Sequence, residues 1–406
     1  MTLKEAMDRA LLVQPAMVQA VGNQRNAAAG TRSAIGTFLP SLSTNWSAVR
    51  GNNNRIDPTT GRPVPAGYSY TFGISANLNL FTGLQRIFNY KASTANQDAA
   101  EAGVVSQRYA TMLQTAQTFY AVLADEELVR VAQAQVAQAQ QQLDISSQKL
   151  KAGSATRSDS LTSAVALGNA RLTLLQAQAN FSTAEAALGR QIGIDTPVRA
   201  LADTALPALP DTANLRAEAL GAAPIVTQAD ANARAAHAGI WTARSQYFPS
   251  IFVSYSDNRQ GIASPSVSNV FTDSLYPRSY SWRFGLSWTL FNGFAREQQQ
   301  VSASVVNDVA ASQAADARRQ VNEQFTQDVT ALATAWEQID IAAANVASAE
   351  EALRVQTERY KVGAGIILDV LTAQATLTQA QVTLVQARFN YVISRAQLIA
   401  LVGHAL

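Results

Sequence analysis

The chain has 406 residues, a net charge of +2 and no cysteine. The near-neutral balance argues against nucleic-acid binding, which usually needs a basic patch, and the missing cysteines exclude disulfides and thiolate metal sites. Charged residues make up only 15% of the chain, whereas the globular average is about 25%.

The sequence contains no obvious helical membrane segment. No run of about 18 apolar residues is present, so we expect no transmembrane helix. The opening MTLKEAMDRALLVQP lacks a basic stretch followed by an apolar one, so we expect no signal peptide within it.

The chain is a tandem duplication. SYTFGISANLNLFTG at 69–83 matches SWRFGLSWTLFNG at 281–293. KAGSATRSDSL at 151–161 matches KVGAGIILDVL at 361–371, and from there a constant offset of 210 residues relates the two copies. Repeats of this kind indicate one structural unit used twice.

Both copies predict the same order of elements, with a first repeat at 1–196, a proline-rich linker at 197–212 and a second repeat at 213–406. In the first repeat we expect helices and strands in this order: a helix near 4–36, strands at about 39–50 and 68–81, and helices at about 84–151 and 157–192. The second repeat predicts a helix near 213–246, strands at about 249–257 and 279–291, and helices at about 294–361 and 367–402.

The two longest helices are unusual for a globular protein. Roughly 67 residues at about 1.5 Å each make a rod near 100 Å long, and patterns of this length are typical of coiled coils. Their alanine and glutamine content favours a thin wall, in which each helix contacts two neighbours and water. A solid antiparallel bundle is the alternative that helical periodicity alone leaves open.

The strands favour the thin-wall interpretation. In the second and fourth strands, large apolar side chains alternate with serine, threonine, glycine and asparagine, so each strand has one apolar and one small polar face. Four strands are too few to form a second sheet that would cover the apolar face. Alternation of this kind is typical of a transmembrane β-barrel. The residues expected to face lipid are Tyr70, Phe72, Ile74, Leu78, Tyr280, Trp282, Phe284, Leu286 and Trp288.

Four strands cannot close a barrel, because single-chain barrels begin at about eight strands. The barrel must therefore be shared between chains. An eight-stranded barrel is filled by its own side chains, so the small residues of the polar face favour an open lumen and three chains. The predicted fold is mainly α with a small β part, and each chain contributes four strands to a trimeric 12-stranded barrel.

Three passages, in this order and duplicated at constant spacing, resemble the TolC-like outer membrane factors of Gram-negative bacteria. They are FGLSWTLFNG, TFYAVLADEELV and ERYKVGAGIILDVLTAQATLTQAQVTLVQARFNYVISRAQL. The resemblance implies a homotrimer whose barrel in the outer membrane continues into a long α-helical tunnel, or α-barrel, through the periplasm. It also implies passive exit of substrates that an inner-membrane RND or ABC transporter and a periplasmic adaptor deliver, for multidrug efflux or type I protein secretion.

The resemblance places the functional residues at the periplasmic tip of the tunnel. In the family, the adaptor docks at helix–helix turns that contain a glycine between small or apolar residues. The matching residues here are Ala152, Gly153, Ser154, Val362, Gly363 and Ala364. Glycine also has an independent reason to lie there, because a reversal between long helices often needs a left-handed backbone.

The resemblance also implies a gate at this tip. Tyr360 and Asp159 match positions that hold the tip shut, and Asp369 matches a ring of aspartates that narrows the pore and attracts cations. Gly365 and Thr372 stand where the family often has a gating arginine and a second aspartate. We therefore expect a gate that depends on a contact between Tyr360 and Asp159 and on packing. The alternative for Asp159 is a structural role, in which Ser158 and Asp159 cap the N-terminus of the returning helix.

Two other classes of function remain as alternatives. An enzyme is disfavoured because the only histidines, His237 and His404, lie far apart, and no metal-ligand spacing, nucleophile elbow or phosphate loop is present. We expect no metal and no cofactor. A soluble coiled-coil structural or secretion-apparatus protein would explain the helices, but it would leave the apolar strand face exposed to water.

Overall fold

The computed structural model describes residues 1–50, 55–56, 59–64, 68–201, 207–210, 215–261 and 277–404. The chain divides into two compact units. The first comprises Met1–Gln24, Ala100–Ala229 and Ala314–Leu406, and the second comprises Arg25–Ala99 and Asp230–Gln313. Each unit takes segments from both sequence repeats, so the two copies are folded together and not side by side as separate domains.

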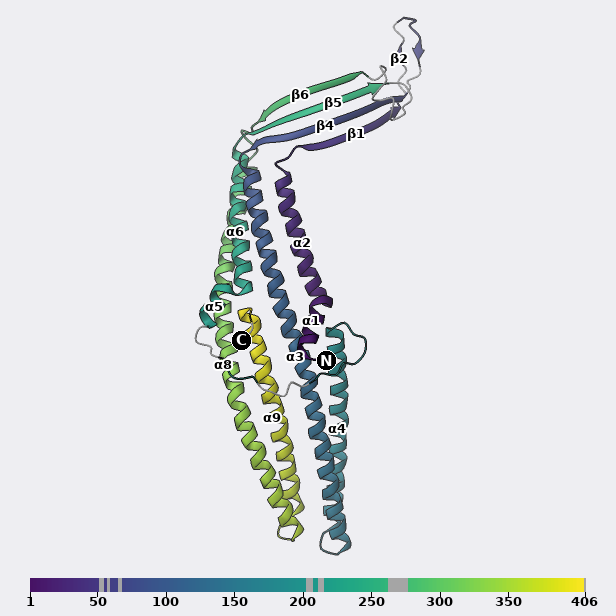
Figure 1. The fold of residues 1–406 in the computed structure, drawn as a ribbon, viewed down its shortest axis with the longest axis vertical. Coiled ribbons are helices and arrows are strands. Elements are labelled where there is room, and N and C mark those ends of the chain that lie inside the picture. Colours follow the sequence, from purple (N-terminus) through teal and green to yellow (C-terminus); the bar gives the residue numbers. More distant parts are fainter. Residues whose placement is uncertain are drawn as a thin grey trace. The chain divides into compact units, whose positions relative to one another are not determined.

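The second unit contains the four-stranded antiparallel sheet that the sequence predicts, in the order β1-β4-β5-β6 (Figure 1). A two-residue pair, β2 (Arg55–Ile56) and β3 (Pro63–Val64), forms a small separate hairpin. Because β1 and β6 each have one neighbour within this sheet, both of its edges are open among the residues that the structure describes. The four long strands are β1 (Ser41–Arg50), β4 (Tyr68–Thr82), β5 (Ser250–Gly261) and β6 (Arg278–Ser287).

The pairing register separates the two faces of the sheet across all four strands. Four serines fall in one transverse row on the polar face, namely Ser43, Ser75, Ser256 and Ser281. Hydroxyl pairs link this row, at 2.8 Å between Ser43 and Ser75 and 2.9 Å between Ser256 and Ser281. On the other face, Trp282 is 63% exposed and Phe284 is 74% exposed. The single chain therefore presents an uncovered aromatic face and a hydroxyl-lined face.

The strand ends differ from the sequence prediction in two places. β6 ends at Ser287, so Trp288 lies just beyond the strand, where its indole nitrogen donates to the Tyr247 carbonyl at 3.1 Å. β5 extends to Gly261, four residues past the predicted end, because its backbone pairs with β4 as far as Tyr70. An irregularity in the β4–β5 register between Asn79 and Phe81 takes Leu80 out of simple alternation.

Two helices of 67 residues each connect to the ends of strands β4 and β6. In the described ranges, no helix is both long and apolar enough to cross a bilayer. The long helices are α3 (Gln85–Lys151) and α8 (Ala295–Lys361), and the shorter returning helices are α4 (Arg157–Gln191) and α9 (Ile367–Val402).

Each predicted first helix is interrupted before a proline. α1 (Leu3–Val13) ends before α2 (Pro15–Gly36), and α5 (Leu215–Ala222) ends before α6 (Pro224–Arg244). Gln14 has an extended conformation with ψ of 126°, because a residue that precedes proline is disfavoured in helical geometry. Proline itself is tolerated as the first residue of the second helix, where its missing N–H costs nothing. The prediction of one continuous helix was wrong at both places.

The first unit has two matching hydrophobic clusters that reflect the duplication. Leu188 of α4 is fully buried in one, with Phe119 and Ile192, and Leu398 of α9 is fully buried in the other, with Tyr391 and Val402. Leu188 and Leu398 are related by the offset of 210 residues. Elsewhere along α3 many buried positions are alanine, so the helices approach closely but bury little apolar area per turn.

Gly285 is the position where the sheet is most sensitive to added volume. A Cβ atom on Gly285 would lie 2.2 Å from the Phe252 ring, which covers it from the paired strand. We expect Gly285→Val to destabilise the protein by about 1–3 kcal/mol through overpacking, measured as a lower melting temperature in detergent. The double variant Gly285→Val with Phe252→Ala should recover part of this loss. Equal stabilities of the single and double variants would contradict the steric explanation.

Candidate functional site: the tip of the two helical hairpins

Two helix–turn–helix hairpins of the first unit, α3–α4 and α8–α9, end in turns of the same type. Gly153 and Gly363 have φ of 73° and 80°, the left-handed region that favours glycine. The N–H of the next residue returns to the helix in each turn, from Ser154 to the Lys149 carbonyl and from Ala364 to the Arg359 carbonyl, both at 2.8 Å. This hydrogen-bond pattern is a Schellman motif.

The residues predicted to receive a partner lie on the surface of these turns. Ala152, Gly153 and Ser154 are exposed, and so are Val362, Gly363 and Ala364. A Cβ on either glycine would meet nothing within 4 Å. The backbone conformation therefore explains both glycines without any crowding, and the space beside the turns is open.

The helices that follow the two turns begin differently. Thr156 is the N-cap of α4 and forms a capping box with Asp159: the Asp159 N–H donates to the Thr156 hydroxyl at 3.2 Å, and the Thr156 N–H donates to the Asp159 carboxylate at 3.3 Å. We expected Ser158 and Asp159 to cap this helix; the N-cap is instead Thr156, and Asp159 takes part in the cap as the third residue of the helix. In α9 the N-cap is Ile366, whose side chain makes no capping bond. Asp369 is thus placed like Asp159 in sequence but is not held in a capping box.

Tyr360 is buried at the end of α8, but its hydroxyl has no hydrogen-bond partner in the part of the chain that is described. Burial raises the pKa of Tyr360, and the nearby charge of Asp159 raises the pKa further. The structure therefore brings Tyr360 and Asp159 close enough for an electrostatic effect, without the hydrogen bond that the expected gate would use.

Lys149 of α3 makes a polar contact between the two hairpins. Its ammonium group donates to the Tyr360 carbonyl and, at 3.2 Å, to the Lys361 carbonyl, and it lies 4.5 Å from the centre of the Tyr360 ring. A cation at the C-terminal end of α8 is also favoured by the helix dipole. Among the described residues, the matching residue in the other copy, Arg359, donates within its own helix and turn, to Gln356 and Ala364. Sequence analysis missed Lys149, because its partners are more than 200 residues away.

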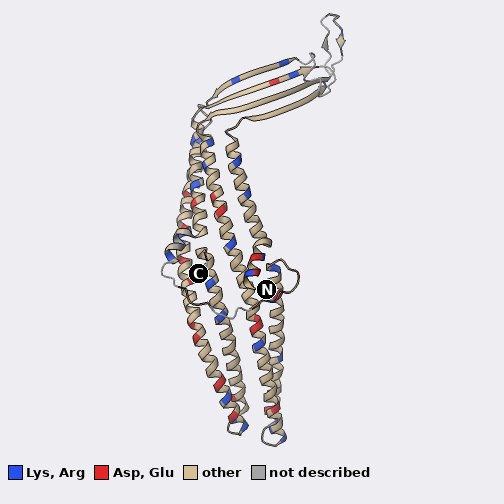
Figure 2. Ribbon diagram, viewed as in Figure 1, with Lys and Arg blue, Asp and Glu red and all other residues tan. Residues whose placement is uncertain are grey.

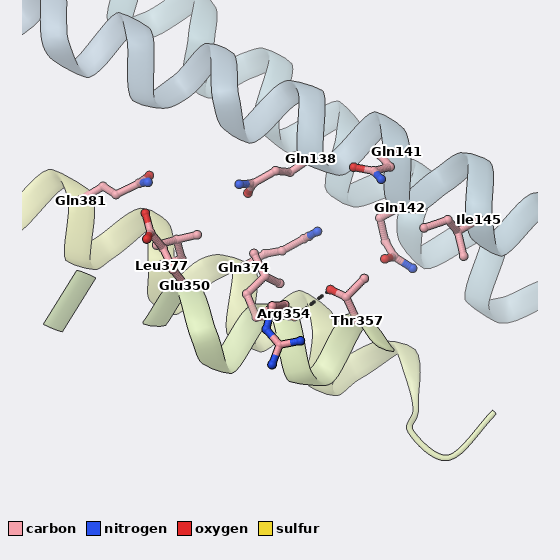
Figure 3. Close-up of a pocket in the computed structure, with 11 residues that line it drawn as sticks. Gln138, Gln141, Gln142, Ile145, Glu350, Arg354, Thr357, Gln374, Leu377 and Gln381 are labelled. Carbon is pink, nitrogen blue, oxygen red and sulfur yellow. Dashed lines mark hydrogen bonds between the residues drawn. The ribbon is translucent and has the colours of Figure 1, made fainter. Parts of the chain in front are cut away.

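A polar groove of about 320 Å³ lies beside the tip, between α3 and the α8–α9 hairpin. Figure 3 shows glutamine side chains entering it from both sides. Gln142 is buried, and its amide nitrogen has no partner among the described residues. An apolar cluster of Ile145, Tyr360 and Val370 follows toward the turn. The groove is lined by Gln138, Gln141, Gln142, Ile145, Glu350, Leu353, Arg354, Thr357, Gln374, Leu377 and Gln381.

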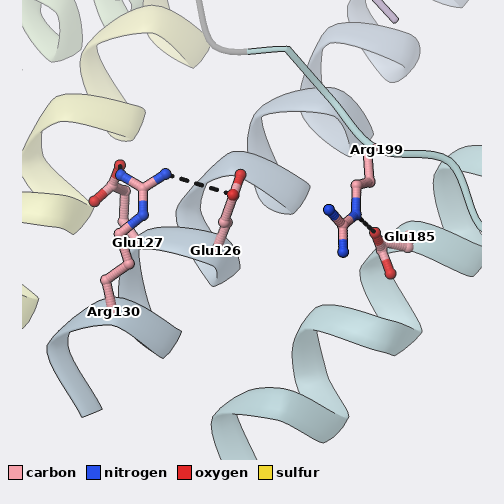
Figure 4. A network of polar contacts seen from close by, with 5 residues as sticks. All are labelled: Glu126, Glu127, Arg130, Glu185 and Arg199. Atoms are coloured by element: carbon pink, nitrogen blue, oxygen red, sulfur yellow. Dashed lines mark hydrogen bonds and ion pairs between the residues drawn. The ribbon is translucent and has the colours of Figure 1, made fainter. Parts of the chain in front are cut away.

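The charged residues further along the helices form surface pairs and no reactive cluster. Arg130 contacts Glu127 at 2.7 Å and Glu126 at 3.4 Å, and Arg199 lies 3.8 Å from Glu185 (Figure 4). The Glu185 side chain is 13% exposed, whereas both partners of the Arg130 pairs are exposed, and exposed pairs contribute about 0–1 kcal/mol each. Among the described residues, no three histidine or acidic side chains come together as metal ligands.

These features define a class of protein: long paired helices with open-ended turns, joined to a sheet that has one apolar face and two open edges. The family model for outer membrane efflux proteins matches residues 6–193 and again residues 215–404. The chain belongs to the outer membrane efflux protein family, whose members are channels of the outer membrane and not enzymes. The two matches also coincide with the two copies found in the sequence.

Relatives and solved structures agree with this assignment. The chain is 26% identical over 380 residues to outer membrane efflux protein BepC of Brucella suis, and the aligned region covers 91% of this chain and 78% of that protein. It is 27% identical over 405 residues to the pyoverdine export outer membrane protein OpmQ of Pseudomonas aeruginosa, covering 95% and 81%. The crystal structure of VceC from Vibrio cholerae has a TM-score of 0.84 at 19% identity and covers 99% of this chain and 96% of that chain. This likeness shows the fold.

Asp328 of α8 is a buried carboxyl group whose charge is unfavourable for folding. Its side chain is 5% exposed and accepts a hydrogen bond from Gln324 at 2.8 Å. Burial raises the pKa of Asp328, while the Gln324 bond acts in the opposite direction. The folded state therefore binds the proton more tightly than the unfolded state. Stability is greatest below the unfolded pKa and falls as the pH rises through the raised folded pKa.

We expect Asp328→Asn to be more stable than the parent at pH 7, by about 1 °C in melting temperature, which corresponds to about 1 kcal/mol in a chain of 406 residues. The gain should disappear at pH 3, where the parent carboxyl group is also protonated. Asp316→Asn is the matched control, because Asp316 is exposed and pairs with Arg319. A gain that is the same at both pH values would argue against burial of the charge as the cause.

Proposed function

We propose that three copies of this chain form a channel-tunnel that gives passive exit through the outer membrane. In this proposal the three sheets close into a 12-stranded barrel in the membrane, and the helices form an α-helical tunnel that extends into the periplasm. A periplasmic adaptor and an inner-membrane RND or ABC transporter deliver the substrate. Multidrug efflux and type I protein secretion are both compatible with this architecture.

The observation that carries the proposal is the sheet. Its edge strands β1 and β6 each present ten residues with one unpaired side in the single chain. Long, apolar open edges require a partner. Because neighbouring strands run antiparallel throughout, β6 of one copy and β1 of the next would also pair antiparallel. Such head-to-tail contacts generate closed rings.

The two faces of the sheet fit a barrel in this orientation. The face of Trp282 and Phe284 would meet lipid, as would the other strand residues expected to do so from the sequence, whereas Trp288 lies beyond the end of β6. The serine row would line the lumen, and each of three copies would contribute one such row of hydroxyl groups. Side chains as small as serine cannot fill the lumen of a barrel with this many strands, so an aqueous path remains.

The tip supplies the gate and the docking surface. We propose that Asp159, Tyr360 and Asp369 form the constriction, with Lys149 as the contact that keeps the two hairpins together. The exposed turns at Gly153 and Gly363 are the surface that the adaptor contacts. The glutamine-lined groove supports a tip that can open, because polar contacts between the hairpins can be exchanged for water at lower cost than an apolar core.

A soluble coiled-coil protein is the alternative, and behaviour in detergent discriminates between the two. We expect the protein to need detergent, to elute as a trimer with light-scattering detection, and to form pores in a planar lipid bilayer. A detergent-free soluble monomer without pore activity would overturn the proposed function.

Lys149→Met tests the gate. Loss of the hydrogen bonds to the α8 carbonyls should favour the open tip by about five- to tenfold, corresponding to about 1–1.4 kcal/mol for a partly buried charged donor. We expect a higher mean single-channel conductance. Arg359→Met is the matched control, since Arg359 bonds only within its own hairpin, and it should leave the conductance unchanged. Equal effects of the two variants would refute the role of Lys149.

Asp369→Asn tests the charged ring. In the proposed trimer three Asp369 carboxylates surround the pore, and their loss should reduce cation selectivity, measured as a reversal potential closer to zero in a salt gradient. Asp159→Asn should change the reversal potential less, because the Asp159 carboxylate is held against Thr156. The assignment of the ring to Asp369 fails if the Asp159 variant has the larger effect.

A further inference from the structure

The apolar face of the sheet ends in arginines. Figure 2 shows that the sheet carries few charges compared with the helices. The register places Arg50, Arg259 and Arg278 on the face of Trp282, and all three lie near the strand ends that are furthest from the helices. The fourth arginine of the long strands, Arg283, lies on the opposite face, in the row of Ser254.

Arg50 and Arg278 lie at one level, and Arg259 within about 3 Å of it, if the strands are tilted as they are in a membrane barrel. Arg259 and Arg278 share a row that continues through Phe72 to Trp46, and Arg50 lies four residues further along β1. Three strand spacings are about 14 Å and four residues are about 13 Å, so the line from Arg278 to Arg50 is inclined by about 43° to the rows. Strands of membrane barrels tilt by about 35–45°.

The surroundings of Arg278 are those of a membrane–water boundary. Its guanidinium contacts the Asp257 carboxylate at 2.7 Å and the Tyr255 hydroxyl at 3.2 Å, and it lies 5.4 Å from the centre of the Tyr280 ring. Asp257 is the only acidic residue in the four long strands, which carry four arginines. Aromatic residues beside charged ones are typical of the interfacial girdle of such barrels.

We infer that Arg50, Arg259 and Arg278 bind the phosphate groups of the glycolipid in the outer leaflet of the membrane. This inference rests on the proposed function, which places the helices in the periplasm and the opposite strand ends at the outer leaflet. Arginine suits this role because its planar fork binds phosphate through two parallel hydrogen bonds. The proposed pairing of β6 with β1 of the next copy also brings Arg278 and the next copy's Arg50 together at the same level, as a site for a headgroup with two phosphates.

Lipid binding to the trimer in detergent, measured by native mass spectrometry, tests the inference. Bisphosphorylated lipid A should bind the parent at least about tenfold more tightly than dephosphorylated lipid A, since each interfacial arginine contributes about fivefold. The triple variant Arg50→Gln, Arg259→Gln, Arg278→Gln should lose this preference. Arg283→Gln is the matched control on the opposite face of β6, and it should retain the preference.

Several outcomes would overturn the inference. The parent does not recognise phosphate if it binds both forms of lipid A equally, and this comparison needs no variant. If Arg283→Gln lost the preference for bisphosphorylated lipid A as completely as the triple variant, the face of Trp282 would have no specific role in binding. Equally tight binding of phosphatidylglycerol would show a general preference for anionic lipids and would refute the assignment to the outer-leaflet glycolipid.

Failure of the inference can be separated from failure of the proposed function. A parent protein that trimerises and conducts ions but does not prefer phosphorylated lipid A refutes the inference alone. A parent protein that neither trimerises nor inserts refutes the proposed function. If the triple variant does not fold, the three single variants take its place, and each should weaken binding of bisphosphorylated lipid A by about fivefold.

Discussion

The structure depends on one constraint: the backbone groups at the edges of a four-stranded sheet must find partners, and within one chain β1 and β6 leave one side of each unpaired. In lipid each unsatisfied backbone group costs several kcal/mol, so an open sheet cannot remain there. Closure with further copies, as proposed, would satisfy the edges, and it would also fix which face meets lipid and which meets water. The long helices then follow from the barrel, because each strand β4 and β6 continues into a helix of the tunnel wall.

Much of the fold was predictable because it depends on local patterns. Alternation with a period of two identifies the faces of β4 and β6, and the duplication locates both long helices. The transverse serine row was not predictable, since it exists only once the register aligns Ser43, Ser75, Ser256 and Ser281. The end of β6 at Ser287 was also missed, because the alternating pattern continues through Trp288 after the backbone has left the sheet.

The tip was predicted in part. The left-handed glycines follow from the need to reverse direction between two helices. The capping box of Thr156 and Asp159 could have been found from its spacing, a threonine followed three residues later by an acid. The contact of Lys149 with the end of α8 could not have been predicted. A cation on a helix surface carries no sequence signal for a partner 211 residues away.

The unequal capping of α4 and α9 means that the two copies of the tip can have different roles. In the first copy Asp159 serves the stability of its own helix, and a change there affects folding first. In the second copy the apolar Ile366 has taken the capping position, so Asp369 supports the first turn of α9 through the helix dipole alone and not through a capping box. One copy thus preserves the architecture, while the other has an acidic residue whose charge can be altered at little structural cost. A duplicated tip can in this way change its ion preference without weakening the hairpin that supports it.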